Sequence, residues 1–192
     1  MTSAMDAVKD AFRAQQALSK QWYDKEREGI ALIEQFQTAL VASRSMAAAK
    51  TTQEETNGGV LKTFVESSER RSAMDPWVLE DLFAQISELK AVFDQLLHGM
   101  YTEYQTARQH VAEASSEEEK GVSASEYVQF LAQDTASFEA EYQHVEALLA
   151  MLTFKITTDQ LRTLVISWST SPFLEPERSK AFRQRHEQAC AK

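Results

Sequence analysis

The pattern that specifies the fold of this chain lies in residues 79–100, LEDLFAQISELKAVFDQLLHGM. Apolar side chains recur there at alternating steps of three and four residues, at Leu79, Leu82, Ile86, Leu89, Phe93, Leu96 and Met100. This spacing places them along one face of a helix, and such a face must be covered by a partner. A second seam of this kind runs through residues 128–152, and a weaker one through residues 8–40. The chain is therefore predicted to be all-α: an antiparallel bundle of three long helices with shorter helices at the C-terminus.

The first helix is expected to begin near Thr2 or Ser3 and to continue to about Ala49, because no proline interrupts it. A helix of that length exceeds the diameter of a compact bundle. Its seam also has a polar middle, formed by Gln15, Ser19 and Glu26. We expect this helix to project from the bundle, to bend at Gly29 or to stop early.

Capping signals place the other helices. Asp75-Pro76 opens the second long helix, and Ser123 with Glu126 forms a capping box before the third. The third helix is expected to end at about Lys155. Thr157 and Gln160 then repeat the box before a short fourth helix, which Pro172 ends. Residues 154–158 offer the weak exception to an otherwise strand-free pattern, and the short connections favour a C-terminal hairpin or cap on the bundle.

The chain is expected to form a single helical-bundle domain over residues 1–175, with a C-terminal extension over residues 176–192. A flexible connection is predicted near residues 50–59, KTTQEETNGG, because paired glycines and small polar residues favour irregular backbone. The following segment, residues 60–72, is expected to be a short helix or a packed turn across the bundle.

Composition indicates a soluble protein of a reducing compartment, cytoplasmic or nuclear. The chain has 192 residues, a formal net charge of −9 and one cysteine, Cys190. No apolar run is long enough to span a membrane. Basic residues are dispersed among acidic ones, which disfavours direct nucleic-acid binding, and the locally basic stretch from Arg178 to Arg185 is expected to be a solvated helix. The densest acidic run is Glu117–Glu119, whose role the sequence does not indicate.

The sharpest candidate for chemistry is Glu141-x-x-His144, which places a carboxylate and an imidazole one helical turn apart. A di-metal bundle enzyme needs two such motifs and further glutamates, so we expect both side chains to lie at the surface beside Tyr142. Asp134 is likewise expected at a solvent edge, and Cys190 with His186 is expected to be an incidental surface pair. The histidines at positions 98, 110 and 186 are scattered. No catalytic residue, cofactor or metal ligand is predicted.

Aromatic residues give the candidates for a partner interface. They are too numerous to share one stripe, because adjacent helical residues diverge by about 100 degrees. Trp77, Phe173 with its neighbour Leu174, and Trp22 are therefore the interface candidates, with the core as the favoured interpretation for Trp22.

The order of these motifs resembles the AIRIM-type ribosome maturation factors, small helical proteins that interact with a AAA ATPase. The resemblance runs through Ala14 to Trp22, then Leu32-Ile33 and Phe36. It continues through residues 78–104, VLEDLFAQISELKAVFDQLLHGMYTEY, and residues 126–152, EYVQFLAQDTASFEAEYQHVEALLAML. It closes with residues 164–177, LVISWSTSPFLEPE, whose Phe-Leu-Glu ending is the strongest local signal. Pro172 and the extension beyond Pro176 depart from the family pattern.

The resemblance implies a non-catalytic accessory subunit. Family members join a AAA ATPase hexamer and a second small helical cofactor, and recruit the machine to precursors of the large ribosomal subunit so that a maturation factor is recycled. The alternative from the sequence alone is a coiled-coil subunit of a trafficking or cytoskeletal tethering complex, because long helical seams also suit self-association.

Overall fold

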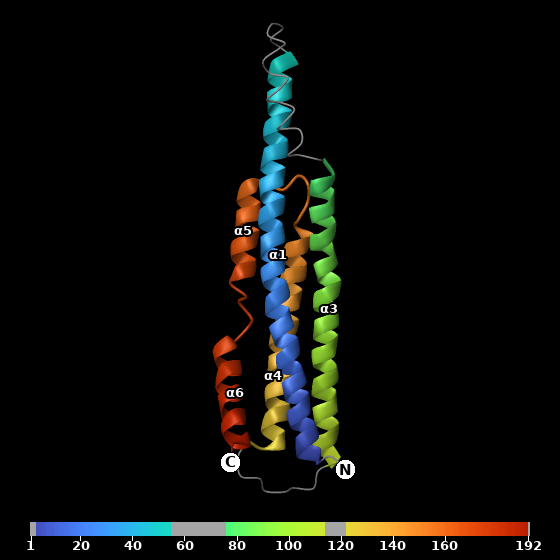
Figure 1. Ribbon diagram of the computed structural model, residues 1–192, viewed down its shortest axis with the longest axis vertical. Helices are drawn as coiled ribbons and strands as arrows, with labels where there is room; N and C mark the ends of the chain where they lie inside the picture. Colours follow the sequence, from blue (N-terminus) through green and yellow to red (C-terminus); the bar gives the residue numbers. More distant parts are fainter. Residues whose placement is uncertain (1–2, 55–75, 114–121, 192) are drawn as a thin grey trace.

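The computed structural model describes residues 3–54, 76–113 and 122–191 and is all-α throughout them (Figure 1). These residues form α1 (Ala4–Glu54), α3 (Pro76–Glu113), α4 (Ala124–Ala150), α5 (Thr158–Ser169) and α6 (Pro176–Cys190). The three long helices α1, α3 and α4 lie side by side and alternate in direction, which confirms the predicted antiparallel bundle. The predicted connection near 50–59 overlaps the end of α1. The rest of that connection lies outside the described residues. So do the predicted segment 60–72, Asp75 and Glu117–Glu119.

The predicted seam of α1 is buried along its whole length. Its ten members are Val8, Phe12, Gln15, Ser19, Trp22, Glu26, Gly29, Ile33, Phe36 and Leu40. The helix has 51 residues, about 77 Å at 1.5 Å per residue, and it continues five residues past the predicted end at Ala49. Its C-terminal part projects beyond the other helices (Figure 1). The helix is continuous through Gly29.

The start of α4 follows the predicted capping box. Ser123 Oγ accepts a hydrogen bond from the backbone N–H of Glu126, and the Glu126 carboxylate accepts one from the N–H of Ser123 at 2.9 Å. The end differs from the prediction, because α4 stops at Ala150 and not near Lys155. Arg44 of α1 donates to the carbonyl oxygens of Phe154 (3.1 Å) and Ile156 (2.7 Å). These two carbonyl groups therefore have hydrogen-bond donors although they lie outside a helix. Residues 151–157 form turns and no strand.

The C-terminal helices are a broken fourth rod of the bundle and not the expected hairpin or cap. The Thr157–Gln160 capping box opens α5 as predicted. α5 and α6 then run in the same direction, one after the other, beside α1 and α4 (Figure 1). Between them Ser171 has a φ of 39°, in the left-handed region, and is followed by Pro172. A proline there cannot donate a helical hydrogen bond, so the rod is interrupted at residues 170–175.

Two apolar clusters fill the bundle. The larger one includes Trp22, Phe36, Phe93, Phe138 and Trp168 and joins α1, α3, α4 and α5. The smaller one includes Val8, Phe12, Tyr127, Phe130 and Phe182 and lies toward the N-terminal end of α1. Buried polar residues occur between the two along α1 and α4, namely Gln15, Ser19, Asp134 and Thr135. Phe182 belongs to α6, so this helix contributes to the smaller cluster. α6 begins just after residue 175, where the bundle domain was expected to end.

Candidate functional site

Two of the four interface candidates are interior residues. Trp22 has no exposed surface and packs between Phe93 and Phe138, with ring centroids 4.6 Å and 5.2 Å away. Leu174 is also buried, and it packs into the larger cluster. Both therefore stabilise the bundle, and the interface role is corrected for them. Trp22 is buried because it lies on the predicted seam of α1, which α3 and α4 cover, whereas Leu174 is buried because the segment between α5 and α6 packs against the bundle.

The other two candidates lie at the surface, in different places. Trp77, in the first turn of α3, is 70% exposed. Phe173 is 48% exposed and lies in the break between α5 and α6, where its ring centroid lies 5.9 Å from that of His144 in a T-shaped arrangement. The two residues therefore do not form one patch.

Trp77 belongs to the end of the bundle from which α1 projects. We call this region the distal end and define it by its exposed apolar side chains, Val41, Trp77, Val78, Met151 and Phe154. They come from α1, α3 and the turn after α4. At this end an aromatic trio joins the three elements: Phe154 lies 4.9 Å from Phe83 and 6.0 Å from Phe36, measured between ring centroids.

A second distinctive region is the set of buried carboxylates that face the break in the fourth rod. Glu26 Oε1 accepts a hydrogen bond from Ser171 Oγ at 2.6 Å, and Glu141 Oε2 accepts one from the N–H of Phe173 at 3.2 Å. Asp134 Oδ1 accepts one from Ser179 Oγ, near the start of α6, at 3.0 Å. Polar groups at the interruption of the rod are thus paired with carboxylates of α1 and α4.

Burial changes the acidity of these groups. Burial raises the pKa of Glu26 to about 7. The hydrogen bond from Ser171 acts against this shift, and the nearby charge of Glu141 adds to it. Burial likewise raises the pKa of Asp134 and of Glu141, since an ionised carboxylate is disfavoured away from water. Tyr23 lies close to all three, and burial followed by the charges of Asp134, Glu26 and Glu141 raises its pKa to about 12.

Asp134 and Glu141 were expected at the surface, and the structure corrects both, because they are 3% and 0% exposed. The predicted seam of α4 holds at Leu131, Phe138 and Val145, but a second buried face lies one residue before it. That face comprises Tyr127, Phe130, Asp134, Glu141 and Leu148. In the sequence, this second buried face of α4 is visible only as adjacent apolar residues such as Phe130-Leu131. Such pairs widen the apolar band and indicate a helix that is covered on two sides.

The histidines do not gather into a site. His144 Nε2 lies 3.4 Å from the carbonyl oxygen and the hydroxyl of Ser167 in α5. His186 is buried, its Nδ1 lies 2.5 Å from Tyr127 Oη, and burial lowers its pKa. The Cys190 sulfur is 3.9 Å from both ring nitrogens of His186. Among the described residues, no three His, Cys, Asp or Glu side chains are arranged to hold a metal ion.

Comparison of the chain with protein-family models, with curated proteins and with solved structures finds no match. Within the described part of the chain, no helix combines the length and the apolar character needed to cross a membrane.

Proposed function

We propose that this chain is a non-catalytic adaptor, an accessory subunit of a AAA ATPase complex that acts in late maturation of the large ribosomal subunit and recycles a maturation factor. The observation that carries the proposal is the distal end. Trp77, Met151 and Phe154 are exposed there, on a bundle whose long seams are buried. Exposed apolar and aromatic side chains gathered at one end are typical of surfaces that bind other proteins.

The ordered resemblance to AIRIM-type factors supports the choice of partner. On this proposal the bundle contacts a AAA ATPase hexamer and a second small helical cofactor, and reaches pre-ribosomal particles through them. The ATPase supplies the nucleotide chemistry, so the adaptor needs no catalytic residues, cofactor or metal of its own. The proposed setting is the cytoplasm or the nucleus, with no membrane attachment. A net charge of −9 supports contact with protein, and not direct contact with nucleic acid.

The test is affinity purification of the tagged full chain from its native source, followed by mass spectrometry. Three chains are compared: the wild type, Trp77→Ser at the distal end, and Ile166→Ser as the matched control. Ile166 is also an exposed apolar residue, 58% exposed, but it lies on α5 and is not one of the residues that define the distal end. Both substitutions remove exposed apolar surface, so thermal unfolding of the two variants is expected to match that of the wild type.

We expect a AAA ATPase and large-subunit precursor particles to co-purify with the wild type and with Ile166→Ser, and to be reduced at least tenfold with Trp77→Ser. Absence of any AAA ATPase from the wild-type sample would refute the adaptor proposal. Equal recovery with all three chains would leave the adaptor but remove the distal end as its contact surface.

A second candidate is a coiled-coil subunit of a trafficking or cytoskeletal tethering complex. The observation in its favour is the projection of α1 past the other helices (Figure 1). A projecting helix can pair with another copy over its free length. Light scattering after size-exclusion chromatography distinguishes the two candidates, because an elongated, concentration-dependent oligomer favours the tether and a monomer contradicts it.

A further inference from the structure

Within the described chain, α6 is held to the bundle through few buried side chains. Of its fifteen residues, Phe182 and His186 are the buried ones. The Phe182 ring stacks on Phe130 of α4, with centroids 4.2 Å apart and an interplanar angle of 15°. It also lies 5.4 Å from Phe12 of α1 and 5.3 Å from Tyr127 of α4. We call Phe12, Tyr127 and Phe130 the aromatic seat.

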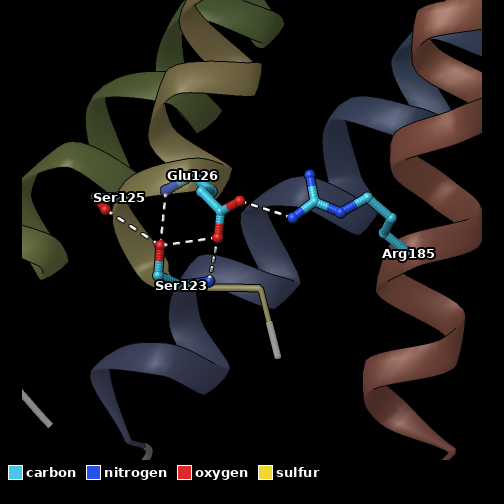
Figure 2. A network of polar contacts seen from close by, with 4 residues as sticks. All are labelled: Ser123, Ser125, Glu126 and Arg185. Atoms are coloured by element: carbon cyan, nitrogen blue, oxygen red, sulfur yellow. Dashed lines mark hydrogen bonds and ion pairs between the residues drawn. The ribbon is translucent and has the colours of Figure 1, made fainter. Parts of the chain in front are cut away.

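Polar contacts surround this aromatic anchor. Arg185 Nη2 of α6 reaches Glu126 Oε1 at the start of α4, at 2.6 Å, and Figure 2 shows that the same carboxylate also completes the capping box with Ser123. Arg183 donates to Gln16 of α1 at 3.0 Å. The Arg185 and Glu126 side chains are 53% and 40% exposed, so their pair aligns α6 more than it stabilises the docked helix.

Polar contacts to α4 hold the N-terminal end of α6, from Ser179 to Asp134 Oδ1 at 3.0 Å and from Arg178 to Ser137 Oγ at 3.2 Å. Its N-cap residue, Glu175, has a φ of −117° and a ψ of 73°, and in the described structure no side chain caps the first turn. The backbone before it is the interrupted segment 170–175. A helix that is attached through two buried side chains, Phe182 and His186, and otherwise through polar contacts, and whose start is uncapped, opens at a lower free energy than helices that share a continuous core.

We propose that the aromatic seat is a docking site for a helix of a partner protein, and that α6 is the intramolecular helix that occupies the seat until the partner displaces it. The chemistry of the partner follows from the present occupant. The partner segment is an amphipathic helix that carries an aromatic residue at position i, an arginine at i+3 to meet Glu126 and a histidine at i+4 to meet Tyr127. In α6 these positions are Phe182, Arg185 and His186. Recognition of a helix through anchors at i, i+3 and i+4 is a general mode of peptide binding.

The arrangement makes partner binding conditional. A helix tethered through a short segment competes at an effective concentration on the order of millimolar, so a free helix of equal intrinsic affinity is excluded at micromolar concentration. Loosening α6 removes that competitor and exposes the aromatic seat. This inference goes beyond the adaptor function and does not depend on which machine the distal end contacts.

The probe is a fluorescein-labelled peptide with the sequence of residues 176–191, with serine replacing its cysteine, and binding is measured by fluorescence anisotropy. The proteins are the full-length wild type, Phe182→Ala, Arg185→Glu, and Gln184→Ala as the matched control. Gln184 is exposed on the same helix. Hydrogen exchange of the α6 amides reports whether the helix has been loosened. Arg185→Glu breaks the ion pair with Glu126 but leaves the buried Phe182 in place, and therefore keeps the test valid if Phe182→Ala impairs folding.

We expect faster exchange in α6 of Phe182→Ala and Arg185→Glu, and peptide binding at least tenfold tighter than to the wild type or Gln184→Ala. A peptide that itself carries alanine at position 182 is expected to bind none of the four. Two results would overturn the proposal: loosened α6 without peptide binding, and α6 exchange as slow in both test variants as in the wild type.

Discussion

Gly29 marks a close approach of α1 to side chains of α5 and α3. A Cβ atom at this position would lie 2.6 Å from Trp168 Cη2 and 2.9 Å from Leu89 Cδ1. Both neighbours are buried, so neither can move aside without disturbing the core. We expect Gly29→Ala to lower the free energy of unfolding by about 1 to 3 kcal/mol, although alanine favours helix by about 1 kcal/mol. Urea denaturation measures the change.

Gly99→Ala is the matched control in α3. The nearest atom to its Cβ is Leu18 Cδ1, at 3.1 Å, which is the end of a half-buried, flexible side chain. Helix propensity should therefore dominate, and the denaturation midpoint should stay the same or rise. Equal gains in stability from the two substitutions would show that the contact at Gly29 is not tight.

Phe93 supports the centre of the larger cluster. It has no exposed surface, and its ring lies 4.6 Å from Trp22 and 6.1 Å from Trp168. Phe93→Ala removes these contacts and leaves a cavity, so we expect a loss of about 3 to 5 kcal/mol in the free energy of unfolding. Ile166→Ala, at a side chain 58% exposed, should change it by less than about 0.5 kcal/mol. Equal midpoints for the two variants would contradict the assignment of Phe93 to the core.

At the scale of helices, the break in the fourth rod links stability to pH through Glu26. Its folded-state pKa of about 7 lies above the ordinary value of 4.5, so the folded chain holds the proton more tightly than the unfolded chain. The stabilisation is complete below pH 4.5 and is lost as the pH rises through 7, with a slope of at most about 1.4 kcal/mol per pH unit. Glu26→Gln keeps an acceptor for Ser171 and should flatten this slope.

Chemical denaturation at pH 4.5, 5.5 and 7 checks this expectation, with Glu34→Gln as the control. Glu34 lies on the same helix and is exposed. The remaining slope of Glu26→Gln should come from Asp134 and Glu141, whose raised pKa values act in the same direction. An identical pH dependence in Glu26→Gln and Glu34→Gln would contradict a buried, protonated Glu26.

Glu126 is expected to act in the opposite direction at lower pH. The hydrogen bond from Arg185, followed by those from Ser123, lowers its pKa to about 2. Its stabilisation is present above the ordinary value of 4.5 and is lost as the pH falls toward 2. Acid therefore weakens the start of α4 and the contact with α6 together (Figure 2). As the pH is lowered toward 3, the protection factors of the α6 amides should fall before those of α3, and simultaneous loss of protection would contradict this order.

At the scale of the whole molecule, the substitution Phe173→Ala is expected to weaken partner binding without changing the stability of the fold. The side chain is 48% exposed, while the contribution of this residue to the break is its backbone N–H, which Phe173→Ala retains. We expect the unfolding midpoint to change little and the recovery of the AAA ATPase in affinity purification to fall. Unchanged recovery would remove Phe173 as an interface candidate and leave Trp77, at the distal end, as the remaining exposed candidate.

Much of the fold could be predicted from the sequence, because one stripe per helix determines a bundle. The seams of α1 and α3, and the capping boxes at Ser123 and Thr157, depend on local spacing. The end of α4 was not predicted, and the turn after it has backbone partners that local spacing does not reveal, because Arg44, more than a hundred residues earlier, donates to Phe154 and Ile156. The burial of Asp134 and Glu141 depends on α5 and α6, which cover a second face of α4 that periodicity alone does not reveal.

The candidate sites were less predictable for the same reason. Trp22 lies on the predicted seam of α1 and Trp77 lies outside the seam of α3, so periodicity favoured the core for Trp22, whereas the burial of Leu174 depends on how the segment between α5 and α6 packs. The polar members of the α1 seam, Gln15 and Glu26, follow its periodicity, yet only their partners across the bundle explain them. Asp134 accepts a hydrogen bond from Gln15, 119 residues away in sequence.

The three tryptophans give the protein a built-in optical readout. Trp22 and Trp168 are fully buried, and among the described residues neither indole nitrogen has a hydrogen-bond partner, whereas Trp77 is 70% exposed. Fluorescence from the two interior indoles should therefore be blue-shifted and should report the integrity of the core. Red-edge emission, and its quenching by iodide, should come mainly from Trp77. One spectrum can thus follow unfolding and occupancy of the distal end separately, with no label attached.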